Sequence, residues 1–210
     1  MVVSTQLIVL SKQSYRESSL LLAGLSPDCG RLSLVAHGAQ KLSAKNFPAV
    51  DLFRELEVEF DDGGKSDLHT ARRLEIATEF DAIAADPRHF RMAGRIGSFL
   101  LKKNSHLLVY QPDTDGYTYD AFKSVLSQLC TPSGTPGCWN MVQCSVVIKT
   151  AYLYENGLLP EASDPRQNDF LENLVAAGIE NSALPACRPD YWKTLNEWLS
   201  SLLDFHHLAR

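Results

Sequence analysis

The chain has 210 residues, of which 45% are hydrophobic and 9% aromatic, a composition that supports packed cores and excludes a disordered tail or linker. Its apolar runs, such as Leu20–Ala23, are only a few residues long, so we expect neither a transmembrane helix nor a secretory signal. The net charge of −5 argues against indiscriminate binding to polyanions but leaves room for a local basic face. The five cysteines form no CxxC pair and are typical of reduced thiols. We therefore expect a soluble cytoplasmic protein.

The charges are distributed unevenly along the chain. Residues 1–50 carry five cations against two carboxylates, whereas residues 51–80 carry a net charge of −5. Residues 88–112 contain five cations and no carboxylate, and residues 113–210 contain 12 acids against 6 bases. Two basic segments, residues 1–50 and residues 88–112, therefore interrupt an otherwise acidic sequence.

The first 80 residues have the alternation and the turn chemistry of β-strands. A Ser-Pro-Asp-Cys-Gly turn over Ser26–Gly30 predicts a hairpin. In the fourth predicted strand, Phe53, Glu55, Glu57 and Glu59 alternate with apolar residues and are expected on the exposed face. The predicted strands are 5–11, 17–26, 31–36, 52–60 and 66–76. Five short strands and one long loop favour a small barrel.

After Ala77 the hydrophobic period changes to that of helices. Asp86 is a suitable N-cap, Pro87 suits the first helical position, and Asn156-Gly157 is a stop signal. The predicted helices are 87–108, 119–130, 139–155, 168–177 and 189–208. The sequence therefore predicts an α+β protein, with a five-stranded β-barrel in residues 1–80 and an all-helical domain in residues 81–210.

The cations of the first basic segment are candidate contacts for DNA. They are Lys12, Arg16, Arg31, Lys41 and Lys45. Single-stranded nucleic acid lies in a groove whose cations follow the phosphates and whose aromatic rings stack on bases. Closure of the barrel would bring these cations toward one face, but Tyr15 and Phe47 are the only candidate stacking residues nearby. Ordinary solvated surface charge is an equally good interpretation.

The second basic segment places four cations on one stripe of the predicted helix. At about 100° per residue they fall within about 60° of one another, beside an apolar face. They are Arg88, Arg91, Arg95 and Lys102. The stripe could extend a DNA path, or it could hold an acidic peptide whose terminal aromatic residue enters an apolar groove. A solvated face that pairs with the acidic half of the chain is the alternative.

No residue pattern indicates a catalytic site, a metal or a cofactor. The chain has no set of four Cys or His ligands at the spacing of a tetrahedral site, no glycine-rich phosphate loop and no nucleophile elbow. We expect Trp139, Trp192 and Trp198 to pack in a core or between domains, and Cys138 and Cys144 to be buried thiols. The sequence therefore predicts a protein that is not an enzyme.

Several segments carry a resemblance to a known family. They are Ile8–Leu10, Tyr15–Leu22, Gly30–Ala39, Leu68–Glu75, Tyr152–Pro160 and Trp198–His206. In this order they resemble the RecO family of bacterial recombination mediators, most densely over residues 6–40. The resemblance implies an OB-fold barrel joined to a helical domain. It also implies binding to single-stranded DNA, to RecR and to the C-terminal tail of single-strand-binding protein, in the cytoplasm and close to the nucleoid. Whether duplex DNA competes with single strands for binding stays open.

The sequence departs from the family pattern in three places. His37 and Gln40 stand where lysine and arginine are usual, which weakens the first basic segment. The zinc ribbon of many members has no counterpart, because residues 161–188 contain only Cys187. The usual Ser-Arg motif after the last helix is missing too.

Two functions remain as hypotheses. The first is a recombination and repair mediator that binds and anneals single-stranded DNA and, with RecR, displaces single-strand-binding protein for RecA loading. The second is an adaptor that bridges RecR and single-strand-binding protein with little DNA binding of its own. The net charge, His37 and Gln40 favour the second.

Overall fold

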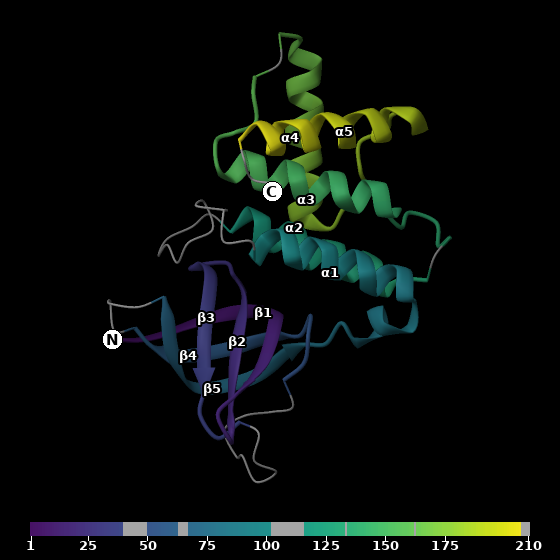
Figure 1. Cartoon of the computed structure of the whole chain (residues 1–210). Coiled ribbons are helices and arrows are strands. Elements are labelled where there is room, and N and C mark those ends of the chain that lie inside the picture. Colours follow the sequence, from purple (N-terminus) through teal and green to yellow (C-terminus); the bar gives the residue numbers. More distant parts are fainter. Residues whose placement is uncertain (40–49, 63–66, 102–115, 133, 162, 207–210) are drawn as a thin grey trace.

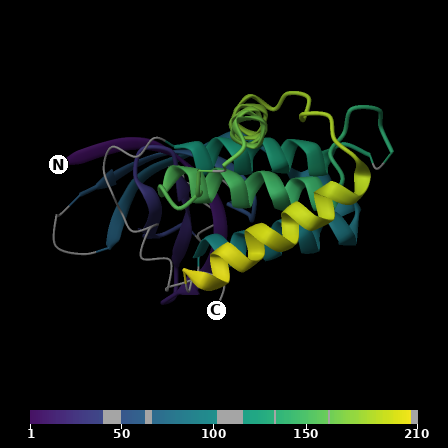
Figure 2. The same ribbon diagram turned by 90° about the horizontal axis from the view of Figure 1, so that it is seen from above.

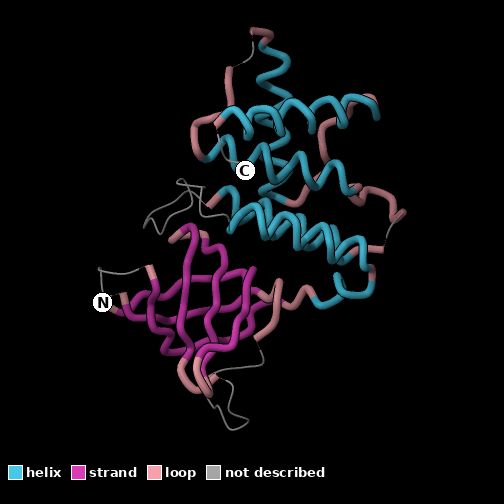
Figure 3. Tube along the Cα trace, viewed as in Figure 1, coloured by secondary structure: helices cyan, strands magenta, loops and turns pink. Residues whose placement is uncertain are grey.

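The computed structural model describes residues 1–39, 50–62, 67–101, 116–132, 134–161 and 163–206. Its strands all lie in the first part of the chain and its helices in the second (Figures 1 and 3). The predicted α+β class, a five-stranded barrel followed by helices, is therefore confirmed. No helix in the described part of the chain is long and apolar enough to cross a membrane.

Five strands close into a barrel. They are β1 (Val2–Tyr15), β2 (Ser19–Ser26), β3 (Gly30–Ala36), β4 (Glu55–Asp61) and β5 (Leu68–Thr78). Around the barrel the order is β1-β2-β3-β5-β4, and every pair is antiparallel except β3 with β5. This is the Greek-key connectivity of an OB-fold. All five strands occur where the sequence predicts them, although β1 is longer at both ends.

The barrel interior is filled by alternate residues of each strand, as a half-buried sheet requires. Leu22, Leu32, Leu34, Leu56 and Phe60 are among the fully buried side chains. The strand β1 bends at a bulge between Val9 and Ser11. Opposite the bulge, a Cβ on Gly24 would lie 2.1 Å from the carbonyl oxygen of Ile8, so only glycine fits there.

The start of the fourth strand differs from the prediction. Residues 52–54 leave the strand, and the backbone N–H of Phe53 donates to the carbonyl of Val9 (2.8 Å). Phe53 has φ of 63° and is 4% exposed, and Glu55 is 1% exposed. The prediction that both side chains face solvent is wrong, because the helices cover this end of the barrel.

A short 3₁₀ turn, η1 (Asp81–Ala85), leads from the barrel into five α-helices. They are α1 (Pro87–Leu101), α2 (Tyr117–Cys130), α3 (Met141–Glu155), α4 (Pro165–Glu180) and α5 (Pro189–Phe205). Asp86 caps α1 as predicted, since its Oδ1 accepts from the N–H of Arg88 (2.8 Å). The turn η1 was not predicted. The predicted part of the first helix beyond Leu101 lies outside the described residues.

The helices pack around α3, whose Tyr152, Val147 and Leu153 are buried. Figure 2 shows α4 end-on and α5 crossing obliquely beside α3. Within residues 163–188, the helix α4 packs on α2 and α3. A Cβ on Gly178 would lie 2.7 Å from Cγ1 of Val147, so the two helices cross at very short range.

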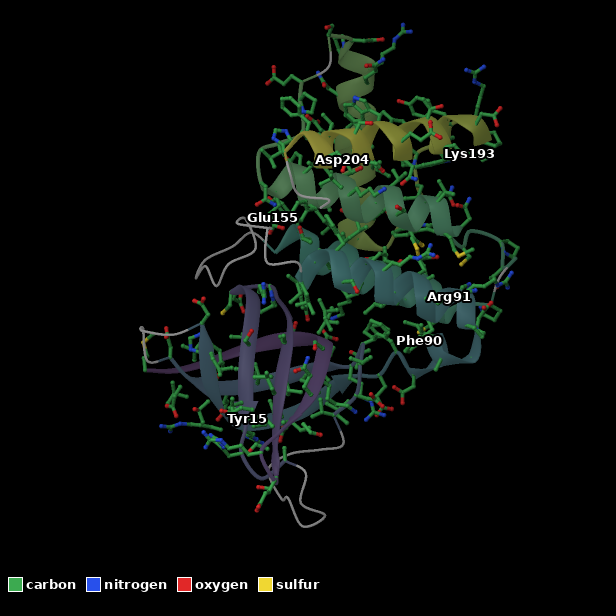
Figure 4. All side chains as sticks on the ribbon, viewed as in Figure 1. Tyr15, Phe90, Arg91, Glu155, Lys193 and Asp204 are labelled. Carbon is green, nitrogen blue, oxygen red and sulfur yellow. The ribbon has the colours of Figure 1, made fainter. Side chains whose placement is uncertain are left out.

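The barrel and the helices share one hydrophobic core. Ile8, Leu25 and Phe53 from the barrel belong to the same buried cluster as α1, α2 and α3. The rings of Phe53 and Phe90 meet edge to face with centroids 5.5 Å apart, and Figure 4 shows Phe90 on the side of α1 nearest the barrel. The two parts therefore form a single packed body.

A buried polar contact also joins the two parts. Oε1 of Glu55, at the start of β4, accepts hydrogen bonds from the hydroxyl of Tyr119 and from Nζ of Lys123, each at 2.6 Å. Both donors lie on α2. Burial acts to raise the pKa of Glu55, but the hydrogen bonds, first that from Lys123, outweigh it and hold the pKa below its ordinary value.

The depressed pKa makes this contact sensitive to acid. Because the folded pKa lies below the unfolded one, the stabilisation is complete above the unfolded pKa, near 4.3, and is lost as the pH falls through the folded value. We expect Glu55→Gln to flatten the acid limb of the stability profile. Urea unfolding between about pH 3 and pH 7 measures this.

The two partners should differ in the effect of their removal. Glu55→Gln leaves Lys123 partly exposed to water and should lower the free energy of unfolding by about 1–3 kcal/mol. Lys123→Met leaves a buried carboxylate without its counter-ion and should cost about 3–5 kcal/mol at neutral pH. Equal losses in the two variants would contradict this account of the contact.

Candidate nucleic-acid interface

One outer surface of the barrel is almost free of charge. On β2 and β3 the inward residues Leu22 and Leu34 face each other, and the outward pairs are Leu21 with Val35 and Ala23 with Ser33. Leu21, Ala23 and Ser33 are half-buried, and Val35 is only 5% exposed. We call these four outward residues, together with Arg31, the β2–β3 face. None of the five is a carboxylate. In OB-folds this is the surface, with the β1–β2 and β4–β5 loops, that holds oligonucleotides.

Arg31 lies at the upper edge of this face. It pairs in register with Leu25, which is buried against the helices, so Arg31 stands where the barrel meets the helical part. Its side chain is half-buried and makes no hydrogen bond or ion pair with any described residue. A guanidinium with free donors is suited to a phosphate.

The β1–β2 turn forms the opposite edge of the face. Arg16 lies over the ring of Tyr15, with the guanidinium carbon 5.1 Å from the ring centroid. Figure 4 places Tyr15 in the lower half of the barrel, far from the helices. Nearby, Oγ of Ser19 and Nδ1 of the exposed His37 lie 3.2 Å apart. The turn therefore presents a cation and an aromatic ring together, next to the acidic Glu17.

The other predicted cations are placed differently. Nζ of Lys12 donates to the carbonyl of Val50 (3.0 Å) and to Asp51 (3.1 Å), so its charge is already paired. Lys41 and Lys45 lie outside the described residues. Among the described cations, Arg16 and Arg31 thus stand at the two ends of the β2–β3 face, and Lys12 is bound to Val50 and Asp51.

The far side of the barrel is acidic. Glu57 and Glu75 are direct neighbours across β4 and β5, and Glu59 faces Arg73. With Asp28 they line a groove of about 420 Å³. Arg73 is paired with Glu75, and Arg72 with Asp61 (2.7 Å). This surface repels phosphates, and the alternation of glutamates in the sequence was the signal for it.

The second basic segment forms an exposed ridge on α1, which consists of Arg88, Arg91 and Arg95. Arg88 pairs with Asp86 (2.8 Å), and its hydrogen bond is the main reason that the pKa of Asp86 is depressed. Arg91 donates to the carbonyl of Pro87 (3.2 Å), whereas Arg95 has no hydrogen bond or ion pair with a described residue. Lys102 lies outside the described residues.

Most of the apolar face of α1 beside this ridge is buried, although Phe90 is 41% exposed. Ala93, Ile96 and Leu100 are buried in the shared core. An apolar pocket of about 250 Å³ does adjoin the first arginine, because Arg88 shares its lining with Leu129, Trp139 and Met141. Nε1 of Trp139 is buried there without a hydrogen-bond partner in the structure.

The remaining candidates behave mostly as expected. Trp139 and Trp192 are buried, but Trp198 is 37% exposed, so the prediction that it packs in a core or between domains is wrong. Burial raises the pKa of the Cys144 thiol to about 12, which makes it unreactive, whereas Cys138 is half-buried. Among the described residues no three Cys, His, Asp or Glu side chains are grouped as a metal site.

Comparison with known proteins gives one match. Residues 1–80 match the family model described as "Recombination protein O N terminal". The matched range ends two residues after β5 and so covers the whole barrel. No curated protein sequence shows significant similarity to the chain.

The backbone of Arg16 allows a test that separates stability from binding. Its φ of 55° lies in the left-handed region, which costs a non-glycine residue about 1–2 kcal/mol. Arg16→Gly removes that strain, so we expect the free energy of unfolding to stay unchanged or rise by up to about 1 kcal/mol. Loss of the cation and of its contact with Tyr15 should weaken single-stranded DNA binding in the same variant. Urea unfolding and fluorescence anisotropy measure the two effects.

Proposed function

Because residues 1–80 belong to the RecO N-terminal family, we propose that this chain is a recombination and DNA-repair mediator that binds and anneals single-stranded DNA on the β2–β3 face. The observation that carries the proposal is the polarity of the barrel. Carboxylates crowd the outer side of β4 and β5, whereas the strand positions of the β2–β3 face carry none. Only one side of the barrel is therefore compatible with a phosphate backbone.

The proposed chemistry is entirely non-covalent. A mediator that acts with RecR to displace single-strand-binding protein for RecA loading needs competing affinities for DNA and for its partners, and no bond is made or broken. In this proposal the protein acts in the cytoplasm, close to the nucleoid. Arg16 and Arg31 anchor the strand at the two ends of the β2–β3 face, and Lys41 and Lys45 extend the contact.

The second candidate function is the adaptor that bridges RecR and single-strand-binding protein with little DNA binding. Its support is the pairing of Lys12 with Asp51, which removes one of the predicted DNA cations, and the histidine at position 37. The net charge of −5 also weakens attraction to DNA at long range.

Salt dependence separates these two functions. Each phosphate contact to a single strand contributes about 0.7 units to the slope of log affinity against log salt. We expect Arg16→Glu with Arg31→Glu to weaken single-stranded DNA binding at least tenfold and to reduce the slope by about 1.4 units. Titration of a labelled oligonucleotide at several salt concentrations gives both quantities.

A matched control lies on the acidic side of the barrel. Arg72→Glu with Arg73→Glu makes the same change in net charge, but both arginines are paired with carboxylates. This control should leave the slope unchanged. If the two double variants weaken DNA binding equally, net charge rather than the β2–β3 face governs DNA binding. The adaptor is then the better hypothesis.

The ridge on α1 is proposed as the seat for the acidic tail of single-strand-binding protein. Arg91 and Arg95 offer exposed guanidinium groups, and the pocket beside Arg88 offers apolar walls for a terminal aromatic residue. The alternative is that the ridge continues the DNA path.

The double variant Arg91→Glu, Arg95→Glu distinguishes these two roles. We expect affinity for an acidic peptide with a C-terminal aromatic residue to fall at least tenfold, since charge-assisted contacts contribute about 1.5–3 kcal/mol each. Binding of single-stranded DNA, titrated separately, should change much less. Intact peptide binding together with a loss of DNA binding would assign the ridge to the DNA path.

A further inference from the structure

The last helix, α5, has two distinct faces. Trp192, Leu195, Leu199 and Leu203 are buried, and the helix packs on α3. On the other side Trp198 is 37% exposed and Phe205 is 77% exposed. In Figure 2 this helix crosses the outside of the helical part, and among the described elements α3 is the one on which it packs most extensively.

The outer face follows a seven-residue repeat. Aromatic residues occur at Tyr191, Trp198 and Phe205, and the small hydroxyl residues Thr194 and Ser201 lie between them. Tyr191 lies at the margin of this face, because it is partly buried and its ring meets that of Phe170 on α4 with centroids 5.5 Å apart. A carboxylate precedes each aromatic residue. The three carboxylates are Asp190, Glu197 and Asp204. All three are exposed, and Figure 4 shows Asp204 near the end of the helix.

A repeat of this length is the pattern of a coiled-coil seam. With the aromatic residues at position a, the hydroxyl residues fall at d and the carboxylates at g, whereas Leu195 and Leu202 at e turn toward the core of the protein itself. Large side chains at a and small ones at d provide alternating knobs and holes. The g residues meet the flank of the opposing helix and select its charge.

We propose that the outer face of α5 docks a helix of another protein, with apolar residues in its seam and lysine or arginine along the flank that meets Asp190, Glu197 and Asp204. The charge of the seam carries this assignment. One carboxylate occurs in every repeat along the same edge. Two described cations lie near this edge: Lys193 lies further round the helix, and Lys149 of α3 donates to Asn196 and Ser200 and interacts with Asp204. A basic flank would neutralise all three.

The same carboxylates disfavour three other partners for this face: a second copy of the chain, nucleic acid and an anionic membrane. In an antiparallel pair of two copies, g positions face g positions, so carboxylates would meet carboxylates. In a parallel pair they would face Leu195 and Leu202, which carry no charge. Nucleic acid and anionic membranes would be repelled by the acidic edge. The proposal does not depend on DNA binding by the barrel.

Designed peptides test the seam directly. The probe is a labelled amphipathic helix of three heptads with leucine at a and d and lysine at e and g, and its twin has glutamate at e and g. Fluorescence anisotropy should show the lysine probe binding at least tenfold more tightly than its twin. Trp198→Ala with Phe205→Ala should abolish this binding, and the exposure of both residues keeps the fold intact, as thermal unfolding will confirm.

Reversing two of the α5 charges tests whether the lysine probe binds specifically rather than by general attraction between opposite charges. Glu197→Lys with Asp204→Lys should reverse the preference, so that the glutamate probe binds more tightly. The matched control is Asp169→Lys with Glu180→Lys on the exposed face of α4, which makes the same change in net charge and should preserve the original preference.

Three results would overturn the proposal. The first is an equal effect of the α4 control and the α5 exchange, which would reduce the binding to net charge. The second is no difference between the two probes on the wild-type protein. The third is self-association of the wild-type chain in sedimentation velocity that Trp198→Ala with Phe205→Ala removes, because the occupant would then be a second copy. None of these results bears on DNA binding.

Discussion

The buried carboxylate of Glu55 is the constraint on which the arrangement of the molecule depends. A charge removed from water needs a counter-ion and hydrogen-bond donors at fixed positions, and here both come from α2, through Lys123 and Tyr119. Hydrophobic contacts such as that between Phe53 and Phe90 add attraction but tolerate sliding. The polar contact does not, because a shift of the helices would leave Glu55 charged and unpaired. The barrel and the helices are therefore held in one orientation.

That orientation decides which surfaces of the barrel remain available. The helices cover Ile8, Leu25 and Phe53, so the upper rim of the barrel is closed and Arg31 marks the edge of the open surface. The acidic side of β4 and β5 stays exposed but is unsuited to nucleic acid. The proposed binding of a single strand is thus limited to the β2–β3 face and to the turn that carries Arg16. The interdomain contact and the proposed DNA path are linked through the position of Arg31.

The sequence predicts local structure well where one physical rule decides it. Alternation and the turn at Ser26–Gly30 locate the strands, and the capping residue Asp86 locates the first helix. The wrong predictions concern which other part of the chain packs over a given surface. Alternation shows that the side chains of Glu55 and Leu56 point to opposite faces of β4. It cannot show that α2 covers Glu55. The pairing of Lys12 with Asp51 joins residues 39 positions apart. In α5, helical spacing gives two apolar stripes, and only the packing on α3 shows that Trp198 belongs to the outer one.

The distribution of charge ties the two proposed surfaces together. Among the described cations of the barrel and α1, three have neither a hydrogen bond nor an ion pair with a described residue: Arg16, Arg31 and Arg95. None of them lines the acidic groove beside β4 and β5. A small number of phosphate contacts gives moderate affinity and a shallow dependence on salt. Moderate affinity suits the proposed mediator role, in which DNA passes to another protein and each contact must be exchanged. The carboxylates of α5 in turn keep DNA away from the seam, so that a basic helix could dock there while the barrel holds a strand.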